Sequence, residues 1–214
     1  YITVVYSLQP VEEIFSYPPN LLVTDPQWDT YKRAFETGSL GRYLVNSFIV
    51  SSAITAGQVT TSVLAAYAFA FLRFPFRNGL FIVFLASLMV PWEVTIIPNY
   101  QTVSTLGWLD SYQGLIVPFL ATAFGTFLIR QAFLGVPRDL RDAAALDGVG
   151  HWGFLREVAV PLARPAIAAF TVFSFLLAWN QYLWPLLVTD DDRHRTVQIG
   201  LKALAGGNVD ELNL

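Results

Sequence analysis

One stretch of this chain combines charged, small and helix-breaking residues in a pattern that suggests a binding surface: RDAAALDGVGHWGFLREVAVPLARP, which covers residues 141–165. It sets Asp142 and Asp147 among alanines, three glycines and two prolines, and apolar runs lie on both sides of it. A connector between two helices needs only a few residues. The stretch therefore predicts a built surface, and its alanines would let a partner approach closely.

The local signals within this stretch predict two short helices. Pro137 disfavours helical backbone at the residue before it and so predicts the end of the preceding helix. Residues 138–146 are good helix formers, and Gly148 suits the left-handed conformation that commonly ends a helix. A second short helix is expected over residues 150–158. The resulting helix–turn–helix would lie outside the bilayer.

The constellations of an enzyme or a metal site are absent from the sequence. There is no cysteine, and His151 and His194 are the two histidines. The phosphate-binding pattern Gly-x-x-x-x-Gly-Lys-[Ser/Thr] does not occur. We therefore expect no catalytic residues, no metal site and no ATP hydrolysis by this chain itself.

The surrounding chain is too apolar for a soluble domain, because 14% of its residues are charged where about a quarter is usual. A helix needs about 20 mostly apolar residues to cross a bilayer. Charge-free runs predict an all-α, polytopic membrane helix bundle with four spanning helices, at residues 44–72, 78–104, 112–133 and 166–188. A large soluble helical protein is the alternative, but soluble helices rarely lack charge on every face over such lengths.

The distribution of charge predicts which side each loop lies on. The loops at 73–77 and 130–165 share one side and hold seven basic residues against four acids, whereas the remaining loops hold six basic residues and twelve acids. Cytoplasmic loops carry the excess of Lys and Arg. We therefore expect a transmembrane domain over residues 43–189 with a cytoplasmic loop at 134–165, and external segments at 1–42 and 190–214.

The sequence DAAALDG, followed by Phe154 and by the pair Pro161 and Pro165, resembles the EAA loop of permease subunits of binding-protein-dependent ABC importers. It departs from that pattern at Asp142, which replaces Glu, and at Val149, which replaces Ala. The segments LVNSFIV, AAYAFAFLRFPFRN, VPWEVTIIPNYQ, LGWLDSYQGLIVPF and AWNQYLWPLL are similar to the carbohydrate-uptake branch with its maltose-type second permease, and most of all to glycerol-3-phosphate permeases. That family has six spanning helices, so the first and the last are expected to be missing from this sequence.

The resemblance implies a mechanical role for the loop. It would dock on a separate ATPase subunit through Asp142, Ala143, Ala144, Asp147, Gly148, Phe154 and Pro161. The implied partners are a homologous second permease, two ATPase subunits that bind ATP and magnesium, an external substrate-binding protein and membrane lipid, with no nucleic acid. The implied location is the cytoplasmic membrane of a bacterium or archaeon, and the implied substrate is glycerol-3-phosphate or a related phosphodiester.

Polar groups at membrane depth are costly and usually functional. Glu93 would lie about 15 residues, or about 22 Å, along the helix at 78–104, where Pro91 and Pro98 predict a break. Asn180 would lie near the middle of the helix at 166–188. The candidate residues of a substrate pathway are Glu93, Asn180, Trp179, Tyr182 and Gln58. Glu93 could instead form a structural ion pair, and Asn180 a hydrogen bond between helices.

Ser51, Thr55, Gln58 and Ser62 form a polar stripe on one helix face. Packing against the partner permease is the preferred interpretation of this stripe, and a pore lining is the alternative. At the level of function, import of maltose-like or other oligosaccharides is the alternative to glycerol-3-phosphate. A stand-alone secondary transporter or channel is the alternative from another class, although such a protein would not need an ATPase-docking helix pair.

Overall fold

A computed structural model describes residues 1–10 and 39–205 and, between them, residues 13, 22, 23, 25–29, 32 and 35. The predicted external segments at 1–42 and 190–214 therefore lie partly outside the described residues. The regular secondary structure of the described part is entirely helical, in agreement with the predicted all-α class. The chain forms two compact units, one of residues 1–49 with 181–214 and one of residues 50–180.

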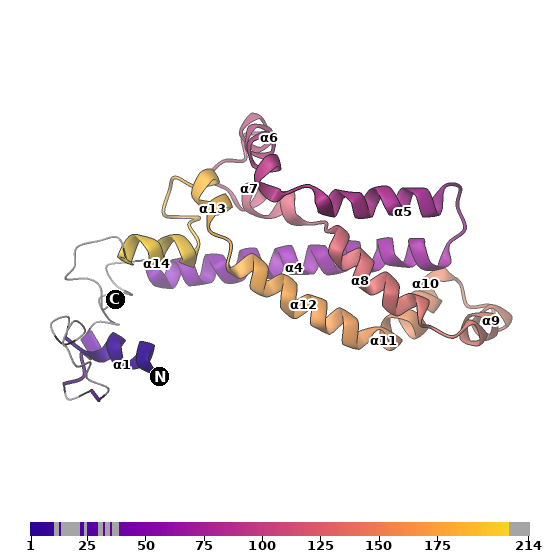
Figure 1. The fold of residues 1–214 in the computed structure, drawn as a ribbon, viewed down its shortest axis with the longest axis horizontal. Coiled ribbons are helices and arrows are strands. Elements are labelled where there is room, and N and C mark those ends of the chain that lie inside the picture. The colour runs from indigo at the N-terminus through magenta and orange to yellow at the C-terminus, as the bar shows by residue number, and fades with distance from the viewer. Residues whose placement is uncertain are drawn as a thin grey trace. The chain divides into compact units, whose positions relative to one another are not determined.

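Helix α4, Leu40–Phe71, is the longest element, with 32 residues. It matches the predicted span at 44–72, since no charged residue occurs from Tyr43 to Leu72. Within the described residues, α4 alone is long and apolar enough to cross a membrane, and up to four spans are present if each bent helix pair counts as one. α4 begins in the first unit and continues into the second (Figure 1).

The predicted span at 78–104 consists of two helices that meet at a bend of 96°. Helix α5, Arg77–Ala86, continues as the short 3₁₀ helix η1, Ser87–Met89, and α6, Trp92–Thr105, follows. Pro91 is extended, with ψ of 139°, and begins α6 as its N-cap, so the expected break at Pro91 is confirmed. Pro98 lies inside α6, and the single span is replaced by two helices.

The predicted span at 112–133 is also bent, by 45°. It comprises α7, Tyr112–Ile116, the 3₁₀ helix η2, Val117–Phe119, and α8, Ala123–Leu134. α8 packs closely on α12, Arg164–Trp179. The contact is so close that a side chain at Gly125 would collide with the ring of Phe170. A small residue at this position therefore sets the approach of the two helices.

The polar stretch forms short helices between α8 and α12, as predicted. Helix α9, Arg138–Leu146, is a separate element. It is followed by α10, His151–Phe154, the π-helical segment η3, Leu155–Ala159, and α11, Val160–Leu162. The second of the predicted short helices therefore extends to Leu162, and a bend of 78° separates it from α12. Figure 1 shows α9 lying across the direction of α4 and α12, at one end of the second unit.

The first unit contains α1, Ile2–Leu8, the start of α4, α13, Leu183–Val188, and α14, Val197–Ala205. Its contacts fix the loop before α14 to the start of α4. The amide of Asn46 donates to the carbonyls of Arg193 and Arg195, at 2.8 and 2.9 Å. The hydroxyl of Tyr43 donates to the carboxylate of Asp192 at 3.0 Å.

The prediction of one helix over 166–188 is wrong. α12 ends at Trp179, and Asn180 is its C-cap. The chain resumes a helix only at Leu183, where α13 begins. Pro185, inside α13, has no amide hydrogen to donate to Gln181, so a helix running through this segment would lack one hydrogen bond.

Candidate functional site

The turn between α9 and α10 is fixed by a glycine in the left-handed region. Gly148 has φ of +73°, as predicted. Its amide donates to the carbonyl of Ala145 at 3.2 Å, and the amide of Val149 donates to that of Ala144 at 2.9 Å. These two bonds form a Schellman motif. A residue with a Cβ at Gly148 would have open space but strained backbone.

α9 turns one face inward and leaves the other exposed. Ala144 is 9% exposed and belongs to the core of the second unit. Asp142, Ala143 and Asp147 are exposed. Of the two alanines expected to meet a partner, only Ala143 is available, because Ala144 holds α9 against its own chain.

Phe154 anchors the second short helix to the end of α4. Its side chain is 5% exposed, and its ring meets that of Phe71 edge-on, with ring centroids 5.2 Å apart. Its ring also lies 6.5 Å from that of Tyr67. Pro161 is half-buried in α11. The phenylalanine of the motif is therefore a packing residue and is not presented to a partner.

A side-chain hydrogen bond joins the same two elements. The hydroxyl oxygen of Tyr67, on α4, lies 3.0 Å from Nδ1 of His151, at the first residue of α10. The shared core contains residues of α4, α8, α9, α10, η3 and α12: Ala66, Tyr67, Ile129, Phe133, Ala144, Phe154, Leu155, Ala159, Ala163 and Phe170. A displacement of α9 and α10 would therefore be transmitted directly to the long helices.

The exposed face of the α9–α11 loop, defined as residues 138–162, carries unpaired charge. Within the described part of the chain, Asp139, Asp142, Asp147 and Glu157 form no ion pair. No group of three or more His, Cys, Asp or Glu side chains among the described residues could hold a metal ion. All four of these acidic side chains are exposed.

Gln58 connects three elements of the second unit. Its amide nitrogen donates to the carbonyl of Phe119, in η2, at 2.9 Å. Its amide oxygen accepts from the hydroxyl of Ser174, on α12, at 2.7 Å. The 3₁₀ turn leaves this carbonyl outside the regular helical ladder, and Gln58 satisfies it. The sequence predicted a pathway residue here, and the structure shows a brace between α4, η2 and α12.

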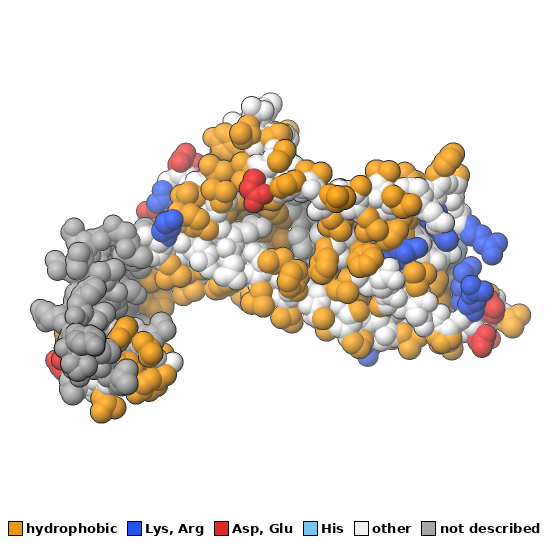
Figure 2. Space-filling view, in the orientation of Figure 1, with side chains coloured by type: hydrophobic (Ala, Val, Ile, Leu, Met, Phe, Trp, Pro, Cys, Tyr) orange, Lys and Arg blue, Asp and Glu red, His pale blue; other side chains and the backbone are white. Residues whose placement is uncertain are grey.

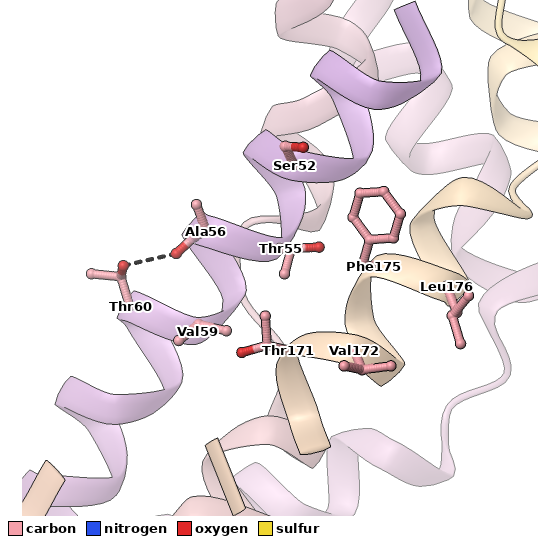
Figure 3. Close-up of a pocket in the computed structure, with 9 residues that line it drawn as sticks. All are labelled: Ser52, Thr55, Ala56, Val59, Thr60, Thr171, Val172, Phe175 and Leu176. Carbon is pink, nitrogen blue, oxygen red and sulfur yellow. Dashed lines mark hydrogen bonds between the residues drawn. The ribbon is translucent and has the colours of Figure 1, made fainter. Parts of the chain in front are cut away.

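The polar stripe of α4 packs inside its own chain, so its predicted packing against a partner permease is wrong. Ser51, Thr55 and Ser62 are each at most 5% exposed. The hydroxyl of Ser174 lies 3.4 Å from that of Thr55. Beside this contact, a groove of about 580 Å³ separates the two helices. Figure 3 shows that its walls come from α4 and α12, with Phe175 and Leu176 on the α12 side.

Glu93 lies in the first turn of α6 and is exposed. The chain bends before Glu93, so its predicted position far along a single helix is wrong. A carboxylate in this turn is favoured by the positive end of the helix dipole. The ring of Trp92 packs on that of Phe119, with centroids 5.0 Å apart. Glu93 therefore lies in the first turn of a helix whose first residue, Trp92, packs on the turn braced by Gln58.

The remaining predicted pathway residues lie at the end of α12 and beyond it. The side chain of Asn180 donates to the carbonyl of Leu176 in its own helix, at 2.7 Å, so the expected position in mid-helix is wrong. Trp179 stacks on Phe175, with ring centroids 5.8 Å apart. Tyr182 belongs to the first unit, where the ammonium of Lys202 lies 4.7 Å from its ring centroid. Asn180 therefore caps a helix.

Comparison with known proteins decides the family. Residues 58–202 match the family of binding-protein-dependent transport system inner membrane components. The chain belongs to this family. The match includes the α9–α11 loop, Gln58 and Glu93, and the resemblance seen in the sequence is confirmed.

Relatives with assigned names agree with the family match. The chain is 43% identical over 211 residues to the sn-glycerol-3-phosphate transport system permease protein UgpE of Agrobacterium fabrum, covering 95% of this chain and 75% of the relative. It is 41% identical to UgpE of Brucella abortus over the same length and shares. UgpE of Yersinia enterocolitica is 38% identical over 198 residues, covering 90% of this chain and 70% of the relative. The chain is thus a permease subunit of an ABC importer.

The fold is that of a solved importer. A bacterial ABC transporter involved in the import of the acidic polysaccharide alginate matches with a TM-score of 0.87, at 22% identity, over 96% of this chain and 72% of that chain. At this identity the likeness concerns the fold. It supports the helical architecture of the chain.

Proposed function

We propose that this permease subunit imports glycerol-3-phosphate or a related phosphodiester and that its α9–α11 loop transmits ATP-driven motion from a partner ATPase. The substrate rests on one observation, which is that relatives 38–43% identical over 90–95% of the chain are named glycerol-3-phosphate permeases. The carboxylate of Glu93 would repel such an anion. A basic residue of the partner permease would therefore have to lie near it.

The proposed transmission rests on the geometry of the loop. Asp142, Ala143 and Asp147 form the exposed docking face, and Gly148 closes the turn behind it. Ala144 and Phe154 fix the loop to the core, and Pro161 lies half-buried where α11 leads into α12. Packed side chains and hydrogen bonds can carry energetic coupling from one subunit to another. The core packing and the contact between Tyr67 and His151 supply such a connection.

The proposed assembly comprises this chain, a homologous permease, two ATPase subunits and an external substrate-binding protein, in membrane lipid. The ATPase subunits would bind ATP and magnesium, and the α9–α11 loop would face the cytoplasm. Residues 73–77 and 130–165 together hold seven basic residues against four acids, and this excess supports the orientation. Gln58, Trp179, Asn180 and Tyr182 would act by supporting the helices around the pathway.

Uptake by the reconstituted complex tests the proposal. Proteoliposomes that contain the permeases and ATPases, with ATP inside and binding protein outside, should accumulate labelled glycerol-3-phosphate. Uptake of maltose without a response to glycerol-3-phosphate would overturn the substrate. Accumulation driven by a gradient without ATP or binding protein would contradict the importer mechanism and favour a stand-alone transporter.

A further inference from the structure

A cleft of about 490 Å³ opens beside the first turn of α9, where the apolar helices of the second unit end. Its lining has two kinds of residue. The apolar wall comes from the ends of α4 and α8 and includes Phe71, Phe133 and Leu134. The polar wall comes from the α4–α5 connection, the first residue of α5 and α9, and it comprises Arg73, Arg77, Arg138, Arg141 and Asp142.

The polar wall is strongly basic, because four guanidinium groups face one carboxylate. Arg73, Arg138 and Arg141 are exposed and, among the described residues, form no ion pair. Arg77 uses one donor to close the turn at Leu72, whose carbonyl lies 3.1 Å away. Each guanidinium offers five donors in a fixed fork that suits phosphate oxygens. The cleft therefore presents an anion site with most of its donors open.

The first turn of α9 strengthens this site. Pro137 is its N-cap and offers no side-chain cap, so the first amides of α9 add positive potential near the cleft. Asp139 in the same turn offsets part of this potential, but it does not line the cleft. Figure 2 shows Lys and Arg side chains gathered at this end of the second unit, beside hydrophobic side chains that cover its helices. The positive potential thus lies where the apolar surface ends.

We propose that this cleft binds the headgroup of an anionic phospholipid, with its phosphate on the arginines and its first acyl carbons against Phe71 and Leu134. Leu134 is 51% exposed beside the arginines. A free phosphate has no apolar group that could pack against such a wall, whereas a phospholipid has acyl chains. Basic pockets between spanning helices are a known setting for anionic lipid headgroups. This inference rests on the membrane class of the chain and not on the identity of the imported substrate.

The test compares two double variants with the same loss of charge. Arg73→Gln with Arg138→Gln removes two arginines from the cleft. Arg156→Gln with Arg164→Gln removes two exposed arginines that do not line it. The purified complex is placed in phosphatidylcholine nanodiscs, and binding of a fluorescent phosphatidylglycerol is titrated. We expect roughly 10- to 30-fold weaker binding for the cleft variant, from about one kcal/mol per arginine, and little change for the control.

Each other outcome identifies a different occupant and overturns the proposal. Equal binding by wild type and both variants would mean that the cleft holds no lipid. A free anion would be the occupant if two results came together. Inorganic phosphate at millimolar concentration would displace the lipid, and phosphatidylcholine and phosphatidylglycerol would bind with equal affinity. Loss of the ATPase on purification of the cleft variant, with lipid binding unchanged, would assign the cleft to contact with that subunit.

Discussion

The hydroxyl oxygen of Tyr67 lies 3.0 Å from Nδ1 of His151 and joins the long helix α4 to the first residue of α10. The rings of these residues also meet nearly at right angles, with centroids 6.0 Å apart. The contact lies directly behind the turn at Gly148. It gives a polar connection, beside the apolar core, between the proposed docking surface and a helix long enough to cross the membrane.

Tyr67→Phe should lower the ATP-coupled uptake of the complex while leaving its assembly intact. The ring would keep its packing, and only the hydrogen bond would be lost, at a cost of about 1 kcal/mol. Tyr100→Phe is the control, because no hydrogen bond of the Tyr100 hydroxyl is seen in the described part of the chain. Uptake per ATP hydrolysed is measured in proteoliposomes. Because Tyr67 and His151 share the hydrogen bond, the double variant with His151→Ala should lose less than the sum of the two single losses, and full additivity would contradict the connection.

Gly148→Ala should uncouple transport from ATP hydrolysis. Alanine at φ of +73° costs about 1–2 kcal/mol in backbone strain, and the turn behind α9 would shift. Gly107 is a matched control, because it ends α6 with φ of +68° and also has open space around it. Both variants should lose similar stability, which thermal unfolding in detergent measures. Only Gly148→Ala should reduce substrate-stimulated ATPase activity, and an equal reduction in Gly107→Ala would show that strain alone is responsible.

Gln58→Leu should destabilise the second unit by about 1–3 kcal/mol, because the carbonyl of Phe119 would lose its Gln58 partner and the hydroxyl of Ser174 would lose the nearer of its two. Thr60→Val is the control, because the Thr60 hydroxyl donates to the carbonyl of Ala56 in its own helix and, within the described ranges, to no other element. The thermal-unfolding midpoint should fall for Gln58→Leu and hold for Thr60→Val. A raised KM for substrate at unchanged stability would instead support a place for Gln58 in the pathway.

The elements that could be predicted from the sequence are those set by local signals. Absence of charge predicted α4 to within four residues at its start, Pro91 predicted the break before α6, and Gly148 predicted the left-handed turn. Backbone preference and hydrophobicity are properties of the single residue, so they can be taken from the sequence without knowledge of the neighbours in space. The all-α class and the separate helix α9 followed from them, whereas the family resemblance came from the DAAALDG motif and the similar segments elsewhere in the chain.

Side-chain direction could not be predicted in the same way. Ala143 and Ala144 are identical in type, and only the packing of α9 on Phe154 decides that Ala144 points inward. Gln58 donates to the carbonyl of Phe119, 61 residues later in the chain. That carbonyl is available because it lies in a 3₁₀ turn, and the sequence of α4 does not indicate this. The end of α12 at Asn180 also lacks a proline or glycine at the break itself, so the sequence favoured a continuous helix.

Docking of α9 on the ATPase is the central claim, and site-directed cross-linking tests it most directly. The chain has no cysteine, so Ala143→Cys places a single thiol on the exposed face of α9. Ser104→Cys, on the exposed surface of α6, is the control. Both are labelled with a benzophenone maleimide in the assembled complex and irradiated. We predict an adduct between this chain and the ATPase from position 143 and none from position 104, whereas no ATPase adduct from position 143 would contradict the account.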